Sequence, residues 1–152
     1  MKRILCSYFY VSVVCIFLSL SFITCKKSSK TDTPNNFSFV YDGTTYTTVH
    51  DTAYQYSPDL VIETAIPNCP IYNANFYLIS SSVGSYTLYN GSGNTTQYVD
   101  NLGNPWQIIS GTVNISGNSN NLLSGNFNVI IKDLSNVTHT TSGNFINMSI
   151  VP

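Results

Sequence analysis

From Phe37 to the C-terminus, apolar and polar side chains alternate along short runs, and no stretch shows the 3.6-residue period of an amphipathic helix. A period of two places neighbouring side chains on opposite faces of a strand, so the pattern predicts an all-β chain. Asp42-Gly43 lies between two such runs and favours a type I′ hairpin, because both turn positions of that hairpin take a positive φ. These features limit the fold to strands joined by short polar turns.

The runs between turn-forming residues predict about eight short strands, and the segment around Tyr54, Tyr56 and Asp59 is expected to be a loop. The expected strands cover 37–41, 44–49, 60–66, 72–80, 84–89, 96–100, 106–116, 122–133 and 143–151. Strands of this length favour an antiparallel β-sandwich, and a closed, lipocalin-like barrel is the alternative. Alternation alone does not distinguish the two architectures.

A four-residue repeat occurs near the C-terminus. Ser124-Gly125-Asn126-Phe127 recurs as Ser142-Gly143-Asn144-Phe145. One interpretation is a paired binding site. We favour the other, in which the copies lie on adjacent strands and each glycine is covered by an aromatic ring.

The first 36 residues differ from the rest of the chain. A basic start, Met1-Lys2-Arg3, precedes a long run without a charge, and Phe22-Ile23-Thr24-Cys25 then resembles the lipobox of a lipoprotein signal. We therefore predict a lipoprotein signal peptide at 1–24, a lipidated N-terminus and flexible tether at 25–36, and a β-sandwich domain at 37–152. Acylation of Cys25, including palmitate, would anchor the protein to a membrane.

Two alternatives for the N-terminal segment remain open. The run 4–23 is long enough for a retained membrane helix, and a cleaved secretory signal also has a basic start and an apolar middle. Without acylation, Cys25 and Cys69 would be free to form a disulfide in an oxidising compartment.

Charge excludes one class of partner. Residues 37–152 contain Lys132 as their single basic residue against six acidic ones, a net charge of −5. Nucleic-acid binding depends on clustered Lys and Arg, so we expect no nucleic-acid partner.

No pattern in the sequence indicates catalysis. His50-Asp51 is the closest pair of metal-ligand types, and His139 is far from it in the chain. Cys69 lies between prolines with no cation nearby, which favours an inert buried thiol. We predict no catalytic residue, no metal and no cofactor. A hydrolase with a dispersed site, using Glu63 or His50, is the weaker alternative.

Aromatic residues with polar neighbours are the candidate ligand contacts. Tyr54, Tyr56 and Trp106 fit this description, because an aromatic ring packs on sugar or protein surfaces while amides and hydroxyls form hydrogen bonds. Each of them also fits a half-buried strand position. Asp51-Thr52-Ala53 resembles a short O-glycan acceptor motif of exported Bacteroidota proteins, which makes Thr52 a candidate for O-glycosylation.

Several ordered motifs together resemble a family of small all-β lipoproteins of the Bacteroidota, a domain family without an assigned activity. They are Phe-x-Phe-Val-x-Asp-Gly at the domain start, Gly84–Leu88, Ser110–Ile115, Ser124–Phe127 and Gly143–Phe145. The resemblance implies an outer-membrane lipoprotein. Known surface-export signals of this phylum place acids after the cysteine, whereas lysines follow Cys25, which favours the periplasmic face over the cell surface.

The expected function is therefore non-catalytic. We expect a lipid-anchored envelope protein that binds a protein or glycan partner. A structural or assembly accessory of an envelope complex is the alternative, and a glycoside or ester hydrolase is the less favoured one.

Overall fold

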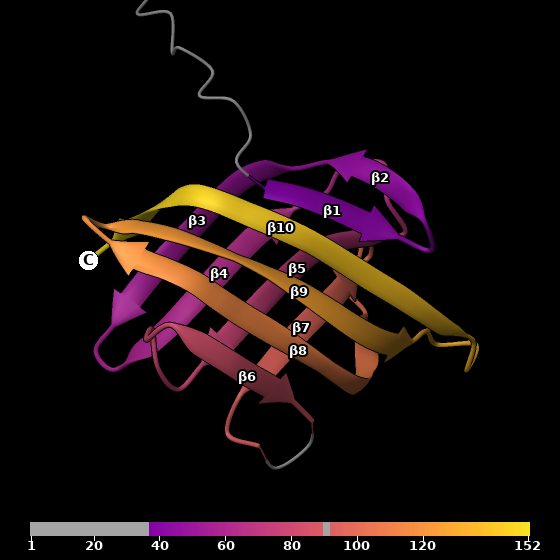
Figure 1. Cartoon of the computed structure of the whole chain (residues 1–152). Helices are drawn as coiled ribbons and strands as arrows, with labels where there is room; N and C mark the ends of the chain where they lie inside the picture. Colours follow the sequence, from indigo (N-terminus) through magenta and orange to yellow (C-terminus); the bar gives the residue numbers. More distant parts are fainter. Residues whose placement is uncertain (1–36, 90–91) are drawn as a thin grey trace, which may run out of the picture. The chain divides into compact units, whose positions relative to one another are not determined.

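The computed structural model describes residues 37–89 and 92–152 as ten β-strands, with no helix in these two ranges (Figure 1). The strands are β1 (Phe37–Tyr41), β2 (Thr44–Thr47), β3 (Val49–Tyr56), β4 (Asp59–Ala65), β5 (Ile71–Leu78), β6 (Gly84–Leu88), β7 (Thr95–Asp100), β8 (Pro105–Ser119), β9 (Leu122–Lys132) and β10 (Thr138–Val151). The all-β prediction is confirmed. The predicted signal peptide, Cys25 and the tether lie outside the described residues.

Seven strands form a closed hydrogen-bonded ring in the order β10-β3-β4-β5-β7-β8-β9, and β9 pairs with β10 again. Neighbours in the ring are antiparallel except β10 and β3, which pair in parallel through Ile150 and Ala53 and through Val151 and Tyr54. Beyond the ring, β1 and β2 continue from β10, and β6 pairs with β8. The sandwich prediction is corrected by this closure, and the alternative of a closed barrel fits better.

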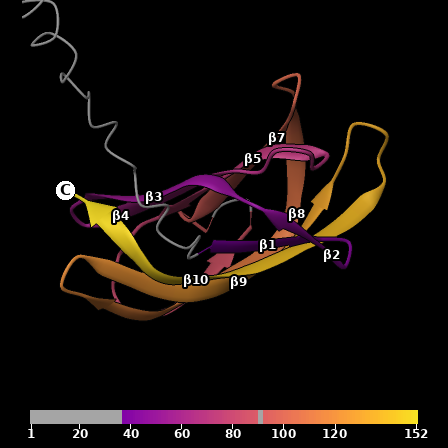
Figure 2. The ribbon, with the colours of Figure 1, turned by 90° about the horizontal axis from the view of Figure 1, so that it is seen from above.

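Two long strands produce the closure by passing from one layer to the other. Figure 2 shows β3, β4, β5 and β7 in one layer and β1, β9 and β10 in the other, with β8 passing between them. β8 pairs with β7 at its start and with β9 along its length, while β10 pairs with β9 first and reaches β3 at its end. Register shifts interrupt both strands, and bulges of this kind let a strand bend.

The turns mostly agree with the sequence. Asp42 and Gly43 have φ values of 45° and 80°, which confirms the expected hairpin between β1 and β2. Asn120 and Asn121, at 54° and 59°, form a second two-residue turn, so β8 runs to Ser119 rather than ending at 116. The segment expected as a loop around Tyr54 is strand β3.

Aromatic side chains fill the interior of the ring. Phe127 is central: its ring centroid lies 4.8 Å from that of Phe76, 5.6 Å from Phe37 and 5.9 Å from Phe39. Tyr98 is also fully buried, and its hydroxyl lies 2.9 Å from Thr141 Oγ1. Buried side chains fill this interior, so the candidate ligand contacts lie on the outside of the ring.

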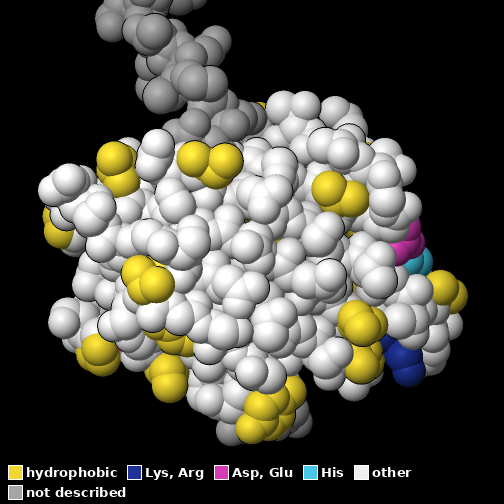
Figure 3. Space-filling model, in the orientation of Figure 1, with side chains coloured by type: hydrophobic (Ala, Val, Ile, Leu, Met, Phe, Trp, Pro, Cys, Tyr) yellow, Lys and Arg dark blue, Asp and Glu magenta, His cyan; other side chains and the backbone are white. Residues whose placement is uncertain are grey.

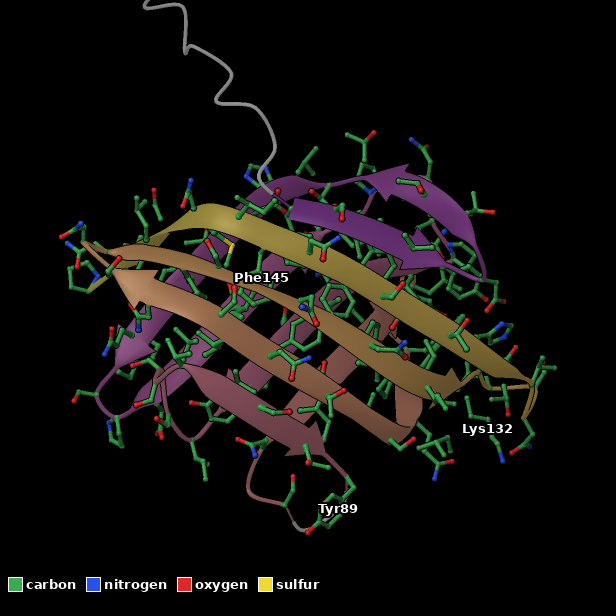
Figure 4. The ribbon with its side chains drawn as sticks, viewed as in Figure 1. Tyr89, Lys132 and Phe145 are labelled. Carbon is green, nitrogen blue, oxygen red and sulfur yellow. The ribbon has the colours of Figure 1, made fainter. Side chains whose placement is uncertain are left out.

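The repeat is explained by the pairing of β9 and β10. Gly125 is opposite Phe145, and Gly143 is opposite Phe127, so each glycine of one copy faces the phenylalanine of the other. A Cβ on Gly125 would lie 2.6 Å from Phe145 Cε2, and one on Gly143 would lie 2.6 Å from Phe127 Cε1. Phe145 is labelled in Figure 4 and is almost fully buried. The interpretation as adjacent strands with covered glycines is confirmed.

Candidate functional site

The outer surface of the layer β3-β4-β5-β7 carries ordered rows of tyrosine, amide and carboxylate side chains. Cross-strand partners in an antiparallel sheet share a face, and Ala53, Ile62 and Phe76 of one such row are buried. The neighbouring rows therefore point outward. They are Thr52, Glu63, Asn75 and Gln97; Tyr54, Val61, Tyr77 and Thr95; and the pair Tyr56 and Asp59. We call this surface the tyrosine face.

Two of its tyrosines stand next to each other along β3. The ring centroids of Tyr54 and Tyr56 are 6.4 Å apart and their planes differ by 20°. Tyr56 is 63% exposed, whereas Tyr54 and Tyr77 are half-buried. The sequence thus identified two residues that lie together, although it placed them in a loop.

The acidic residues divide into two groups by their hydrogen bonds. Four of the six carboxylates of 37–152 hold backbone turns, threonines or a histidine in place; these are Asp42, Asp51, Asp100 and Asp133. In the described ranges, no hydrogen bond or ion pair engages the side-chain carboxylate of Asp59 or of Glu63. Both belong to the tyrosine face, so this face has two carboxylates that form no hydrogen bond or ion pair with the described residues.

A hollow of about 350 Å³ opens at the end of the tyrosine face. Its lining includes Tyr56, Asp59, Val61, Tyr77 and Ile79, together with Gly93 of the segment before β7. A hollow of this volume lies at the lower end of the range, roughly 300–1,000 Å³, of small-molecule sites. The most exposed tyrosine of the face and one unengaged carboxylate therefore border the same space.

Asn94 fixes the segment that borders this hollow. Its side chain is 8% exposed, its Oδ1 accepts a hydrogen bond from Ile79 N at 3.1 Å, and its Nδ2 donates to Thr87 O at 3.4 Å. Gly93 also borders a second hollow of about 470 Å³ beside Tyr89 and Gln107. Tyr89 is labelled in Figure 4, at the loop after β6.

Trp106 is not part of the tyrosine face. It lies at the start of β8 in an aromatic cluster, with its ring 5.4 Å from the ring of His139 and 6.1 Å from that of Tyr41. Tyr41 and His139 stack at 5.1 Å. The structure therefore separates the three aromatic candidates, keeping Tyr54 and Tyr56 together and assigning Trp106 to packing around a histidine.

His139 joins two hairpins. Its Nδ1 lies 2.7 Å from Asp42 Oδ2 in the β1–β2 turn and 2.8 Å from the Tyr41 hydroxyl, and its Nε2 lies 3.5 Å from Asp133 Oδ2 at the β9–β10 turn. Thr140 N also donates to Asp42 at 2.8 Å. In Figure 3 the charged side chains and histidine that are visible gather at one edge of the molecule.

The electrostatics of this cluster favour a charged histidine. Burial disfavours the imidazolium, but the hydrogen bonds with Asp42 and Asp133 outweigh it and raise the pKa of His139. Burial also opposes the charged form of Asp42, but its bonds with His139 and Thr140 lower the pKa of that carboxyl. Burial, followed by the nearby charge of Asp42, raises the pKa of Tyr41 to about 12. In the described ranges, the side-chain partners of His139 are Tyr41, Asp42 and Asp133.

We expect the contact between Asp42 and His139 to be pH-dependent. The coupling energy from the variants Asp42→Asn, His139→Gln and their double variant should be favourable at about pH 6, where His139 is charged. It should fall as pH rises through the raised pKa of His139, and again at acidic pH through the lowered pKa of Asp42. Urea unfolding at several pH values measures it. Asparagine preserves the hairpin turn, and a coupling that stays constant across this range would contradict the assignment.

The remaining sequence candidates are dispersed. His50 lies exposed with a φ of 58° at the register shift of β3, and Asp51 instead accepts hydrogen bonds from Thr48 and Thr64. Thr52 lies within β3 opposite Glu63, and its O-glycosylation stays a prediction. Cys69 is 8% exposed, and burial raises the pKa of its thiol to about 11, which agrees with an inert thiol.

Residues 37–89 and 92–152 contain no group of three His, Cys, Asp or Glu side chains arranged to hold a metal ion. Within the same ranges, no helix is long and apolar enough to cross a membrane. Comparison with known proteins found no match to a family model, to a curated protein or to a solved structure. The function must therefore be argued from the site.

The sequence did not reveal two associations between distant residues, one within the tyrosine face and one outside it. Tyr77 and Glu63 join Tyr54 only through the pairing of β3, β4 and β5, which no local spacing indicates. Asp42 and His139 are brought together by the pairing of β1 with β10 and of β10 with β9.

Proposed function

We propose that this protein is a non-catalytic envelope protein, anchored by lipid at Cys25, whose β-domain binds a protein or glycan partner through the tyrosine face. The observation that carries the proposal is that this face has carboxylates which form no hydrogen bond or ion pair with the described part of the chain. Asp59 and Glu63 flank the tyrosine rows without a partner in the described ranges, whereas the other four carboxylates are engaged by the fold. Exposed aromatic rings beside such groups are suited to recognition.

The opposite surface offers a comparison within the same domain. The outward residues of β8, β9 and β10 are mostly Asn, Ser and Thr, and Asn114 Nδ2 donates to Asn126 Oδ1 at 2.9 Å. Figure 3 shows this side as largely polar and uncharged, with scattered hydrophobic side chains. It lacks the combination of rings and unengaged carboxylates, so we place the binding surface on the tyrosine face.

The full chain, purified in detergent and immobilised, should retain a component from solubilised envelope of the cells that produce it. The variant Tyr54→Ala/Tyr56→Ala should reduce retention about tenfold or more, because large aromatic side chains dominate binding energy. Asn126→Ala/Asn128→Ala is the matched control, since it removes two outward residues with the same spacing on β9. Equal retention by the tyrosine variant and the wild type would exclude this face, with circular dichroism confirming that each variant is folded.

A further inference from the structure

We infer that the ligand of the tyrosine face is an uncharged glycan chain, lying along Tyr54 and Tyr56 and entering the hollow beside Tyr56. This inference rests on the proposed function and specifies its ligand. It is argued from the shape of the face, from its unengaged polar groups and from its charge.

The apolar part of the face is small and consists mainly of the flat faces of tyrosine rings. Tyr54 and Tyr56 stand 6.4 Å apart with nearly parallel planes, and Val61 and Tyr77 continue the row across β4 and β5. The C–H faces of sugar rings pack on such aromatic surfaces. A protein interface would instead need a larger apolar core. In the three rows the exposed large apolar side chain is Tyr56, with Ile79 at the hollow, and Val49 and Tyr72 lie apart from them towards the other end of β3 and β5.

The polar part of the face matches hydroxyl groups. No side chain or backbone group in 37–89 or 92–152 bonds to the carboxylates of Asp59 and Glu63, so these can accept hydrogen bonds from a ligand. Bonds to an ionised acceptor are stronger than bonds between neutral groups. Asn75 and Gln97 lie in the same row as Glu63 and provide both donors and acceptors. A ligand that presents many hydroxyls would pair with these groups on one side while its ring contacts a tyrosine.

Charge selects among glycans. Lys132 is the single Lys or Arg of 37–152, and it lies at the end of β9, beside the β9–β10 hairpin (Figure 4). It is not in any row of the tyrosine face. Among the residues that the structure describes, the face has two carboxylates without a partner and no cation. It therefore repels sulfate, phosphate and uronate groups, so the glycan is one without acidic sugars.

The test is calorimetric titration of the full chain in detergent with short chains of glucose, mannose, xylose and N-acetylglucosamine, and with oligogalacturonate as the acidic counterpart. We expect at least one uncharged chain to bind and oligogalacturonate not to bind. Tyr54→Ala/Tyr56→Ala should weaken that binding about tenfold or more, and Asn126→Ala/Asn128→Ala should leave it unchanged. Asp59→Asn/Glu63→Gln should weaken binding of the uncharged chain and reduce the discrimination against oligogalacturonate.

The outcomes separate the two proposals. If no uncharged chain binds, or if the tyrosine variant binds as the wild type does, the glycan inference is overturned. If an envelope protein is then retained by the wild type and lost from the tyrosine variant, the binding function stands with a protein ligand. Loss of both kinds of binding would overturn the proposed function as well.

Discussion

Gly125→Ala should destabilise the domain by about 3 kcal/mol, because there is no room for a side chain between β9 and its neighbours. The added Cβ would overlap the carbonyl oxygen of Asn114 and the ring of Phe145, and its distance to Phe145 Cε2 would be 2.6 Å. A backbone oxygen in a paired strand cannot move without breaking the ladder. A loss of this size is a large part of the roughly 5–15 kcal/mol that stabilises a typical domain. The free energy of unfolding in urea measures it.

Gly143→Ala should have a similar effect, since its Cβ would meet Ser38 O and the ring of Phe127. The matched control is Gly117→Ala on β8, where the nearest atom outside the adjoining residues, Ser124 Cβ, would be 3.9 Å away. That variant should change stability by less than about 1 kcal/mol. If Gly125→Ala and Gly117→Ala proved equally stable, the close approach of ring and backbone would be disproved.

Cys25→Ala should abolish lipid attachment completely. In the proposed lipoprotein processing, the acyl chains would be attached through the Cys25 sulfur and would contribute about 0.8 kcal/mol of membrane affinity for each buried CH₂. We expect palmitate labelling to fall to background and the chain to keep residues 1–24. Labelling and intact mass are the decisive measurements. Release from the membrane is not a suitable measurement, because an uncleaved apolar segment would itself hold the variant at a membrane.

Cys69→Ala is the control for that experiment, since Cys69 is the other cysteine of 25–152 and is buried in the domain. It should retain the label and the mature N-terminus at Cys25. An unlabelled wild type, or a mature chain that begins elsewhere, would reject the lipoprotein prediction. The secretory alternative would then return, and with it a disulfide between Cys25 and Cys69.

Local sequence was sufficient for the features that depend on neighbouring residues. The hairpin at Asp42-Gly43 follows from the φ preference of two positions, and strand alternation follows from the geometry of one strand. The Ser-Gly-Asn-Phe repeat also predicted its structure. Its two copies are close in sequence and lie on adjacent strands, where each phenylalanine ring needs a glycine opposite it because a larger residue would leave no room. Net charge likewise depends on composition alone.

Tertiary structure decided the features that depend on which strands meet. Tyr54 was expected in a loop together with Tyr56 and Asp59, yet pairing with β4 makes it a strand residue. The barrel closes because β8 and β10 bend at register shifts. In β10 the shift moves the buried positions from odd to even numbers, from Phe145 to Met148, and short alternating runs do not reveal that both parts belong to one bent strand. The assembly of the tyrosine face and of the Asp42–His139 contact follows from pairings between strands distant in the chain. Backbone hydrogen bonds hold those pairings but are the same for every residue except proline. The choice of partner and register depends on side-chain packing between distant segments, which local sequence does not show.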